Sequence, residues 1–266
     1  MLAFLLPNTA LAERNDGQSE QSETKKRKVK RKSKRKGKRK GKRSKLKRYP
    51  LKINARPLVL PVGLNELSSN LNYRSMSDVT SAAMGVSFKR GVIRNLEIGG
   101  STGLLLNPEV DWSSSFTLQG GYKIAGQRKG LSLAAQVTIP LNFGENQDVI
   151  SSLNGGLATR YRLNKQVAFH TGEDMLQLTL GEKSAVRINI PIGVAFQVNK
   201  RINVRADTNI MNFGGGGDAI TIADSLPLKL RGFYTIRRAM DVGVAINKDL
   251  TNDNGWSAMG MFNYRM

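Results

Sequence analysis

Apolar and polar residues alternate along most of the chain after residue 63. The clearest stretch is residues 185–198, AVRINIPIGVAFQV, in which every second residue from Val186 to Val198 is a large apolar one. The positions between them include Arg187, Asn189 and Gln197. A period of two turns the two sets to opposite faces of a strand. Because a sealed core would penalise the polar set, the pattern predicts a strand between lipid and a wet lumen.

The same alternation recurs and predicts twelve strands. Their expected ranges are 64–75, 79–90, 92–106, 114–125, 130–143, 150–163, 166–180, 185–198, 201–213, 226–238, 239–248 and 255–266. In the range 166–180 the apolar phase changes between Phe169 and Leu176, which predicts a β-bulge near Gly172.

The expected connections fall alternately into a short set and a mostly longer set. The short set includes 126–129, 164–165, 199–200 and 237–239, and the other set includes 107–113, 144–149, 214–225 and 249–254. Short periplasmic turns and longer outer loops are typical of outer-membrane barrels. An even number of strands then places the C-terminus on the short-turn side.

The final segment, GWSAMGMFNYRM, carries Phe262, Tyr264 and Met266 in one phase. It resembles the C-terminal targeting signal of Gram-negative outer-membrane β-barrel proteins, which the barrel-insertion machinery reads. That family usually ends in an aromatic residue, whereas this chain ends in Met266. The resemblance implies a porin-like barrel in the bacterial outer membrane, crossing it many times.

The expected fold class is all-β: an antiparallel transmembrane up-and-down β-barrel of about 12 strands over residues 64–266, with a disordered basic N-terminal arm. Residues 1–12, MLAFLLPNTALA, resemble the back half of a signal peptide, with an apolar run and a small-x-small cleavage pattern. Residues 13–48 lack aromatic residues and are expected to be a disordered, periplasmic arm. Residues 49–63, rich in proline, are expected to be a linker.

Most of the net charge of +22 belongs to the arm, because residues 25–48 hold 18 Lys or Arg and no acid. Three interpretations compete. The arm binds an anionic polymer or lipid head groups, it is a solvated spacer, or it binds nucleic acid. Export disfavours the nucleic-acid interpretation.

Enzymatic chemistry has little support in the sequence. Cysteine is absent and His170 is the single histidine, so no metal, cofactor or catalytic residue is predicted. A hydrolase would need a serine beside His170, and no serine motif surrounds that residue. We therefore do not expect an enzyme, with a hydrolase as a minor alternative.

Charged residues opposite the apolar rows indicate a lumen that favours anions. The candidate lumen-lining residues are Lys123, Arg160, Arg162, Arg187, Arg205, Asp207, Lys229, Arg231 and Arg237. A narrow cation-lined path focuses its field on anions. The main hypothesis is a small porin-like channel for small or anionic solutes. The alternative is a structural anchor in outer-membrane lipid whose basic arm tethers an anionic periplasmic partner.

Overall fold

The computed structural model of the chain describes residues 45–76, 79–107, 110–128, 130–144, 149–150, 152–172, 175–179, 185–215, 220–222, 226–251 and 255–266. The expected signal peptide and the expected arm as far as residue 44 lie outside these residues. None of the helices within the described part is long and apolar enough to cross a membrane.

The described chain is almost entirely β-structure. Two 3-10 helices, η1 (Lys45–Arg48) and η2 (Ile53–Ala55), precede the strands. The strands are β1 (Asn65–Met76), β2 (Val79–Ile93), β3 (Leu96–Asn107), β4 (Asp111–Arg128), β5 (Leu131–Asn142), β6 (Ser152–Arg162), β7 (Val167–Thr171), β8 (Leu176–Thr179), β9 (Ala185–Gln197), β10 (Ile202–Gly215), β11 (Ile220–Ile222), β12 (Pro227–Arg237), β13 (Met240–Asp249) and β14 (Trp256–Arg265).

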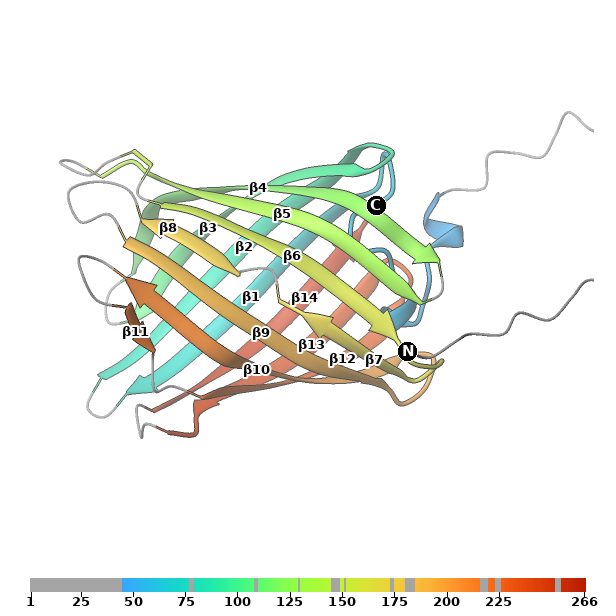
Figure 1. The fold of residues 1–266 in the computed structure, drawn as a ribbon. Coiled ribbons are helices and arrows are strands. Elements are labelled where there is room, and N and C mark those ends of the chain that lie inside the picture. Colours follow the sequence, from blue (N-terminus) through green and yellow to red (C-terminus); the bar gives the residue numbers. More distant parts are fainter. Residues whose placement is uncertain are drawn as a thin grey trace, which may run out of the picture. The chain divides into compact units, whose positions relative to one another are not determined.

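These strands form a closed antiparallel barrel (Figure 1). Each main strand pairs with its sequence neighbour. The whole of β14 also pairs with β1, which closes the sheet. Strands β7 and β8 together fill one position between β6 and β9, and β11 only extends β10. The barrel therefore has 12 strand positions, which confirms the predicted fold class.

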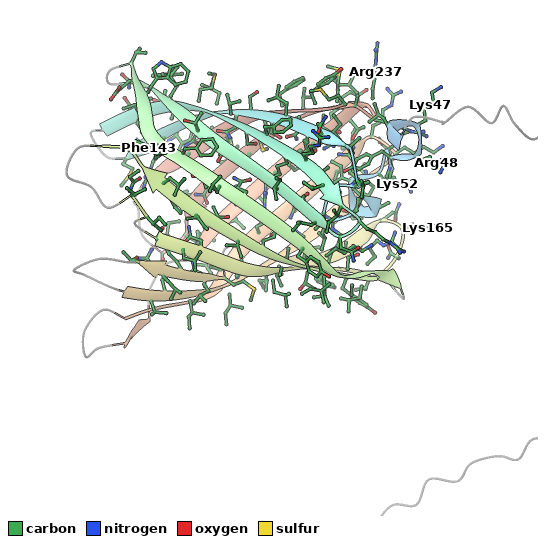
Figure 2. The ribbon with its side chains drawn as sticks, turned by 90° about the horizontal axis from the view of Figure 1, so that it is seen from above. Lys47, Arg48, Lys52, Phe143, Lys165 and Arg237 are labelled. Atoms are coloured by element: carbon green, nitrogen blue, oxygen red, sulfur yellow. The ribbon has the colours of Figure 1, made fainter. Side chains whose placement is uncertain are left out.

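The apolar rows lie on the outside of the barrel. On β9, Val194 and Phe196 are 40% and 44% exposed, while Ala195 is 2% exposed between them. Figure 2 shows side chains covering the outer surface along the strands. The orientation that the alternation predicts is confirmed, because a soluble barrel would place these rows in its centre.

The predicted bulge is present between β7 and β8. Thr171 is paired with Ile192 of β9, and Leu176 is paired with Ile188, so one extra residue stands on the β7–β8 side. This extra residue returns Leu176 to the outer face after Phe169. The bulge therefore explains why the apolar residues of the sequence change phase between Phe169 and Leu176.

The prediction that residues 214–225 form a loop throughout is partly wrong. Its residues Ile220–Ile222 form β11, which pairs with Phe213–Gly215 at the end of β10. The two isoleucines flank Thr221 with the period of a strand, and this signal is too short to stand out in the sequence.

Residues 49–63, expected to be a linker, and Leu64 lie against the inner wall at the short-turn end of the barrel (Figure 1, blue segment). We call these residues the plug segment. They pack with the barrel as part of one compact unit, Ser44–Met266.

Candidate functional site

Polar side chains alternate with the outer rows and face the lumen. Across β7, β9, β10 and β12, the register aligns His170, Gly193, Asp207 and Lys229 in one inward row. Arg205 lies opposite Arg231 in the neighbouring row. The period-two backbone brings these residues together from segments far apart in the sequence.

A polar cluster occupies the middle of this wall. We call His170, Arg205, Asp207 and Arg231 the lumen cluster. The guanidinium of Arg231 donates from Nε to Asp207 Oδ2 at 2.8 Å. Asp207 Oδ1 lies 3.1 Å from His170 Nε2, and Arg205 Nε lies 3.2 Å from the same nitrogen. One carboxylate therefore lies among two guanidiniums and an imidazole.

Gly193 makes the lumen cluster sterically feasible. A side-chain carbon at this position would overlap with Asp207 Oδ1 and with the ring of His170. Any larger residue would push these two side chains apart, because the clash involves their short, confined ends.

The partners of the His170 ring are charged side chains. Its Nδ1 lies 2.9 Å from Arg205 Nη2, and its Nε2 faces both Arg205 and Asp207. Both ring nitrogens are engaged by these partners rather than by a serine hydroxyl, which a hydrolytic triad requires. Among the described residues, no group of three His, Cys, Asp or Glu side chains is placed to hold a metal.

Arg160 connects the lumen wall to the plug segment. It lies beside His170 in the β6–β7 register. Its Nη1 donates to the carbonyl oxygen of Arg56 at 2.8 Å and to that of Ile53 at 3.4 Å. Because these acceptors carry no charge, they do not neutralise the positive charge of the Arg160 guanidinium.

An ion-pair network around Asp241 fixes the plug segment to the barrel. Arg56 Nη1 lies 2.5 Å from Asp241 Oδ2, and Arg56 Nη2 lies 2.9 Å from Oδ1. Arg265 Nη1 lies 2.6 Å from the same Oδ2, and its Nε lies 2.6 Å from Glu66. Asp241 is 1% exposed. A carboxylate so deeply buried is tolerable only because two guanidiniums compensate for its charge.

Asn54 anchors the next part of the plug segment. Its backbone N–H donates to Gln197 Oε1 at 3.2 Å, and its side-chain oxygen accepts from Asn203 Nδ2 at 3.0 Å. Its side-chain nitrogen donates to the carbonyl oxygens of Gln166 and Ala195. These bonds satisfy amide groups that are otherwise costly to bury.

Further plug contacts include a bond from a backbone N–H to a carboxylate and a small apolar cluster. The N–H of Leu60 donates to Glu97 Oε2 at 2.7 Å. Tyr49, Leu60 and Leu64 are buried together, and the guanidinium of Arg265 lies 5.1 Å from the Tyr49 ring centre. Burial raises the pKa of Tyr49 above its usual value, so its hydroxyl stays neutral. Polar bonds predominate in holding the segment.

The plug segment narrows the barrel end without filling it. A cavity of about 220 Å³ lies between the segment and the wall near Arg160 and Arg265. Another, of about 320 Å³, lies between Pro57 and Lys123. Each volume exceeds the roughly 30 Å³ that one water molecule occupies. Water therefore has room beside the segment.

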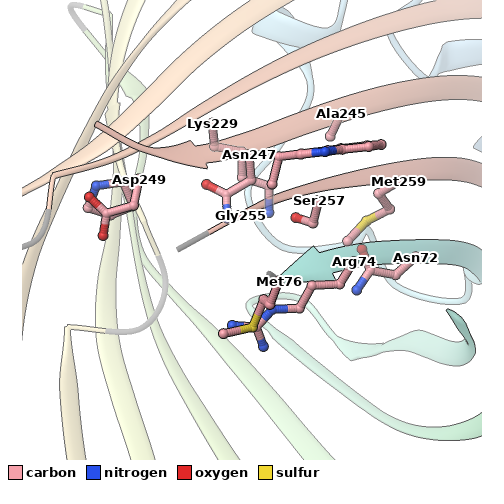
Figure 3. Close-up of a pocket in the computed structure, with 12 residues that line it drawn as sticks. Asn72, Arg74, Met76, Lys229, Ala245, Asn247, Asp249, Gly255, Ser257 and Met259 are labelled. Carbon is pink, nitrogen blue, oxygen red and sulfur yellow. The ribbon is translucent and has the colours of Figure 1, made fainter. Parts of the chain in front are cut away.

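At the other end of the lumen the wall encloses a larger cavity of about 510 Å³ (Figure 3). Arg74 and Lys229 reach it from β1 and β12, and Asn72, Asn247 and Ser257 add neutral polar groups. Asp249 lies at its border, where it accepts hydrogen bonds from Leu226 and Thr251. Polar and apolar side chains thus line the cavity together, at the end of the barrel away from the plug segment.

Eight of the candidate lumen residues lie in the inward register: Lys123, Arg160, Arg162, Arg187, Arg205, Asp207, Lys229 and Arg231. The ninth, Arg237, follows a register shift after Thr235 and lies exposed at the short-turn end (Figure 2). In the C-terminal segment, Phe262 and Tyr264 face outward with Val242 and Met240, and Met266 exchanges backbone hydrogen bonds with Asn65.

The sequence reasoning missed the acidic side of the lumen. Glu66, Glu97 and Asp241 all point inward, and Arg265 and Arg56 pair there. Asp241 occupies the polar phase opposite Val242, so the alternation contained this signal. Arg56 had no comparable signal, because the plug segment has no periodicity.

No family model matches the chain, and no curated protein matches it. Solved structures do match. A KdgM porin covers 74% of this chain and 98% of its own length, with 7% identity and a TM-score of 0.50. A KdgM porin in complex with disordered oligogalacturonate has the same coverage and identity with a TM-score of 0.51. A NanC porin, at 9% identity, covers 74% of this chain and 97% of its own length with a TM-score of 0.50. The predicted resemblance to outer-membrane barrels is thereby confirmed for the fold.

Proposed function

We propose that this chain, a porin-like outer-membrane β-barrel by fold, is a small channel that favours small anions. The observation that carries the proposal is the cationic inner wall from β6 to β12. Within the lumen cluster, Arg205 and Arg231 share the single carboxylate of Asp207. Arg160 beside them bonds neutral carbonyl oxygens. The middle of the lumen therefore carries an excess of positive charge.

Confinement increases the effect of that charge. The protein wall has a low dielectric constant, so field lines from the arginines concentrate in the water-filled path. An anion that enters from the long-loop end first meets Arg74 and Lys229 and then the lumen cluster. The same groups repel a cation and so form an electrostatic barrier to it.

The plug segment limits the size of the solute. Side chains nearly fill barrels of about eight strands, and 16–18 strands leave a wide aqueous channel. This barrel, with 12 strand positions, is intermediate, and its own residues 49–64 occupy part of the short-turn end. We expect small conductance steps that increase when the segment is released.

The test is a reversal-potential measurement in planar bilayers under a salt gradient. The wild-type protein should show anion selectivity. The variant Arg74→Gln/Lys229→Gln/Arg231→Gln should lose most of it, because three inward charges are removed. The matched control Arg48→Gln/Lys165→Gln/Arg237→Gln removes the same charge from exposed residues and should keep the wild-type selectivity. Absence of conductance steps, or selectivity for cations, would exclude the proposal.

A second candidate function is the structural anchor, and the bonded plug segment favours it. Asp241 and Asn203 are almost fully buried beneath the segment, as in a permanent closure. In this function the short-turn end faces the periplasm, and residues 25–48 bind an anionic polymer there. The anchor is supported if neither the wild type nor a variant with a weakened plug conducts, while the wild type is retained on an anionic polymer.

A further inference from the structure

An apolar groove of about 420 Å³ lies on the outside of the barrel, across β6, β7, β9, β10 and β12. Its outer lining includes Tyr161, Phe169, Ile192, Val194, Thr208 and Leu228. His170, Gly193 and Asp207 of the inward row also border the groove, but it shares no lining residue with the lumen cavities at either end. The groove does not depend on conduction.

Small residues on β10 create this groove. Ala206 lies between Val194 of β9 and Leu230 of β12 in the outward row. Thr208 lies between Ile192 and Leu228 in the next row. Each short side chain is flanked by larger ones on both sides, so the surface is depressed along β10.

Hydrocarbon must fill the depression when the barrel is in a membrane. Lining atoms without neighbours lose dispersion contacts, and an apolar lining gives water too few hydrogen-bond partners. An acyl chain supplies contacts along the whole groove. The apolar groove therefore fits the tail of a lipid.

Cations lie at the membrane edge below the groove. The β6–β7 turn carries Lys165 and the β9–β10 turn carries Lys200 and Arg201, all exposed. Arg201 Nη1 also lies 3.2 Å from the hydroxyl of Tyr234, an outward aromatic residue at the same edge. Figure 2 shows Lys165 at the short-turn end of the barrel. These turns contain no acidic residue.

The spacing between the groove and these cations matches one leaflet. They lie four to six residues from Tyr161, Phe169, Val194 or Ala206 along the chain. At about 3.3 Å per residue and a tilt of about 45°, this separation is roughly 9–14 Å along the membrane normal. Half of the hydrocarbon core is about 15 Å thick. A phosphate at the turns would thus place its acyl chain in the groove.

We propose that this groove and the cations of the two adjacent turns bind one anionic glycerophospholipid of the short-turn leaflet. The apolar lining holds an acyl chain, and Lys165, Lys200 and Arg201 hold the phosphate, which carries the negative charge of the head group. Each nearby cation favours an anionic surface by about 1 kcal/mol, which corresponds to roughly fivefold.

The experiment uses the full chain in nanodiscs of phosphatidylcholine with a minor fraction of phosphatidylglycerol. After detergent extraction, native mass spectrometry counts the lipid that each barrel retains. The wild type should keep one phosphatidylglycerol. The groove-filling variant Ala206→Trp should lose it. The matched control Ala258→Trp, on the outward face of β14, should keep it.

A second pair of variants tests the head-group site. Lys165→Gln/Lys200→Gln/Arg201→Gln should reduce the preference for phosphatidylglycerol over phosphatidylcholine by on the order of a hundredfold. The control Lys47→Gln/Arg48→Gln/Arg237→Gln, at the same end but outside these turns, should not. Equal retention by Ala206→Trp and Ala258→Trp, or an unchanged preference in the turn variant, would overturn the proposal. Thr208→Leu replaces Ala206→Trp if the latter fails to fold, as judged by heat-modifiable gel mobility.

Discussion

Asp241 is the residue on which the plug segment depends most. Its two carboxylate oxygens bind Arg56 and Arg265, and Thr235 donates to Oδ1 at 2.8 Å. Arg265 has a second acidic partner, Glu66, whereas the ion pair that the structure gives Arg56 is with Asp241. The two arginines therefore depend on this carboxylate to different degrees.

We expect Asp241→Asn to destabilise the folded protein by about 3–5 kcal/mol, because it leaves buried Arg56 without a counter-charge. Arg56→Met should cost less, since Arg265 still neutralises Asp241. Urea unfolding of the refolded protein measures both values, with exposed Arg48→Met as the control. Equal costs for the two plug variants would contradict this interpretation of the network.

At the scale of the element, the junction between β7 and β8 is the unusual part of the wall. The β6–β7 and β6–β8 ladders stop on either side of Gly156 to Thr159. Between these ladders, side chains form the hydrogen bonds to the backbone of β6. The Thr171 hydroxyl accepts from the N–H of Thr159 at 2.9 Å and donates to the carbonyl oxygen of Leu157 at 2.7 Å. A single hydroxyl thus replaces two ladder bonds.

We expect Thr171→Val to cost about 1–3 kcal/mol, because the N–H of Thr159 loses its acceptor in an apolar setting. The carbonyl oxygen of Leu157 keeps only the longer bond, of 3.3 Å, from the hydroxyl of Thr159. The amide of Thr159 should also lose its protection in hydrogen exchange. The isosteric control is Thr208→Val, since the Thr208 hydroxyl has no hydrogen-bond partner within the described part of the chain. The control should leave stability nearly unchanged. Normal protection of the Thr159 amide in Thr171→Val would show that the hydroxyl is dispensable.

At the scale of the whole molecule, a group of exposed basic residues lies at the short-turn end of the described barrel. Exposed Lys165, Lys200, Arg201, Arg237 and Arg238 lie in or beside the short turns. Arg238 also donates to the backbone carbonyl of Lys47, in η1. Lys47 and Arg48, the last residues of the basic stretch, therefore lie at an end of the barrel that already carries cations.

Deletion of residues 25–43 should leave the barrel intact, because the compact unit begins at Ser44. We expect unchanged heat-modifiable gel mobility and a loss of retention on an anionic polymer. A variant with the short-turn charges neutralised is the companion control, since it tests whether the barrel end contributes to retention. Loss of heat-modifiable mobility after the deletion would show that the arm takes part in folding.

The sequence by itself determined the barrel. Strict alternation in stretches such as 185–198 fixes which side chains face outward, and the phase change near Gly172 locates the bulge. Period two is a local property of the backbone, so neighbouring residues are enough to read it. The inward position of Arg205 and Asp207 follows from the same rule.

Only the tertiary structure decided the partners inside the lumen. Arg56 and Asp241 are 185 residues apart, and Asn54 meets Asn203 across 149 residues. Strand tilt and barrel closure bring these residues together, and no local pattern encodes that register. The plug segment lacks periodicity altogether, so its place within the barrel end depends on side chains contributed by distant strands.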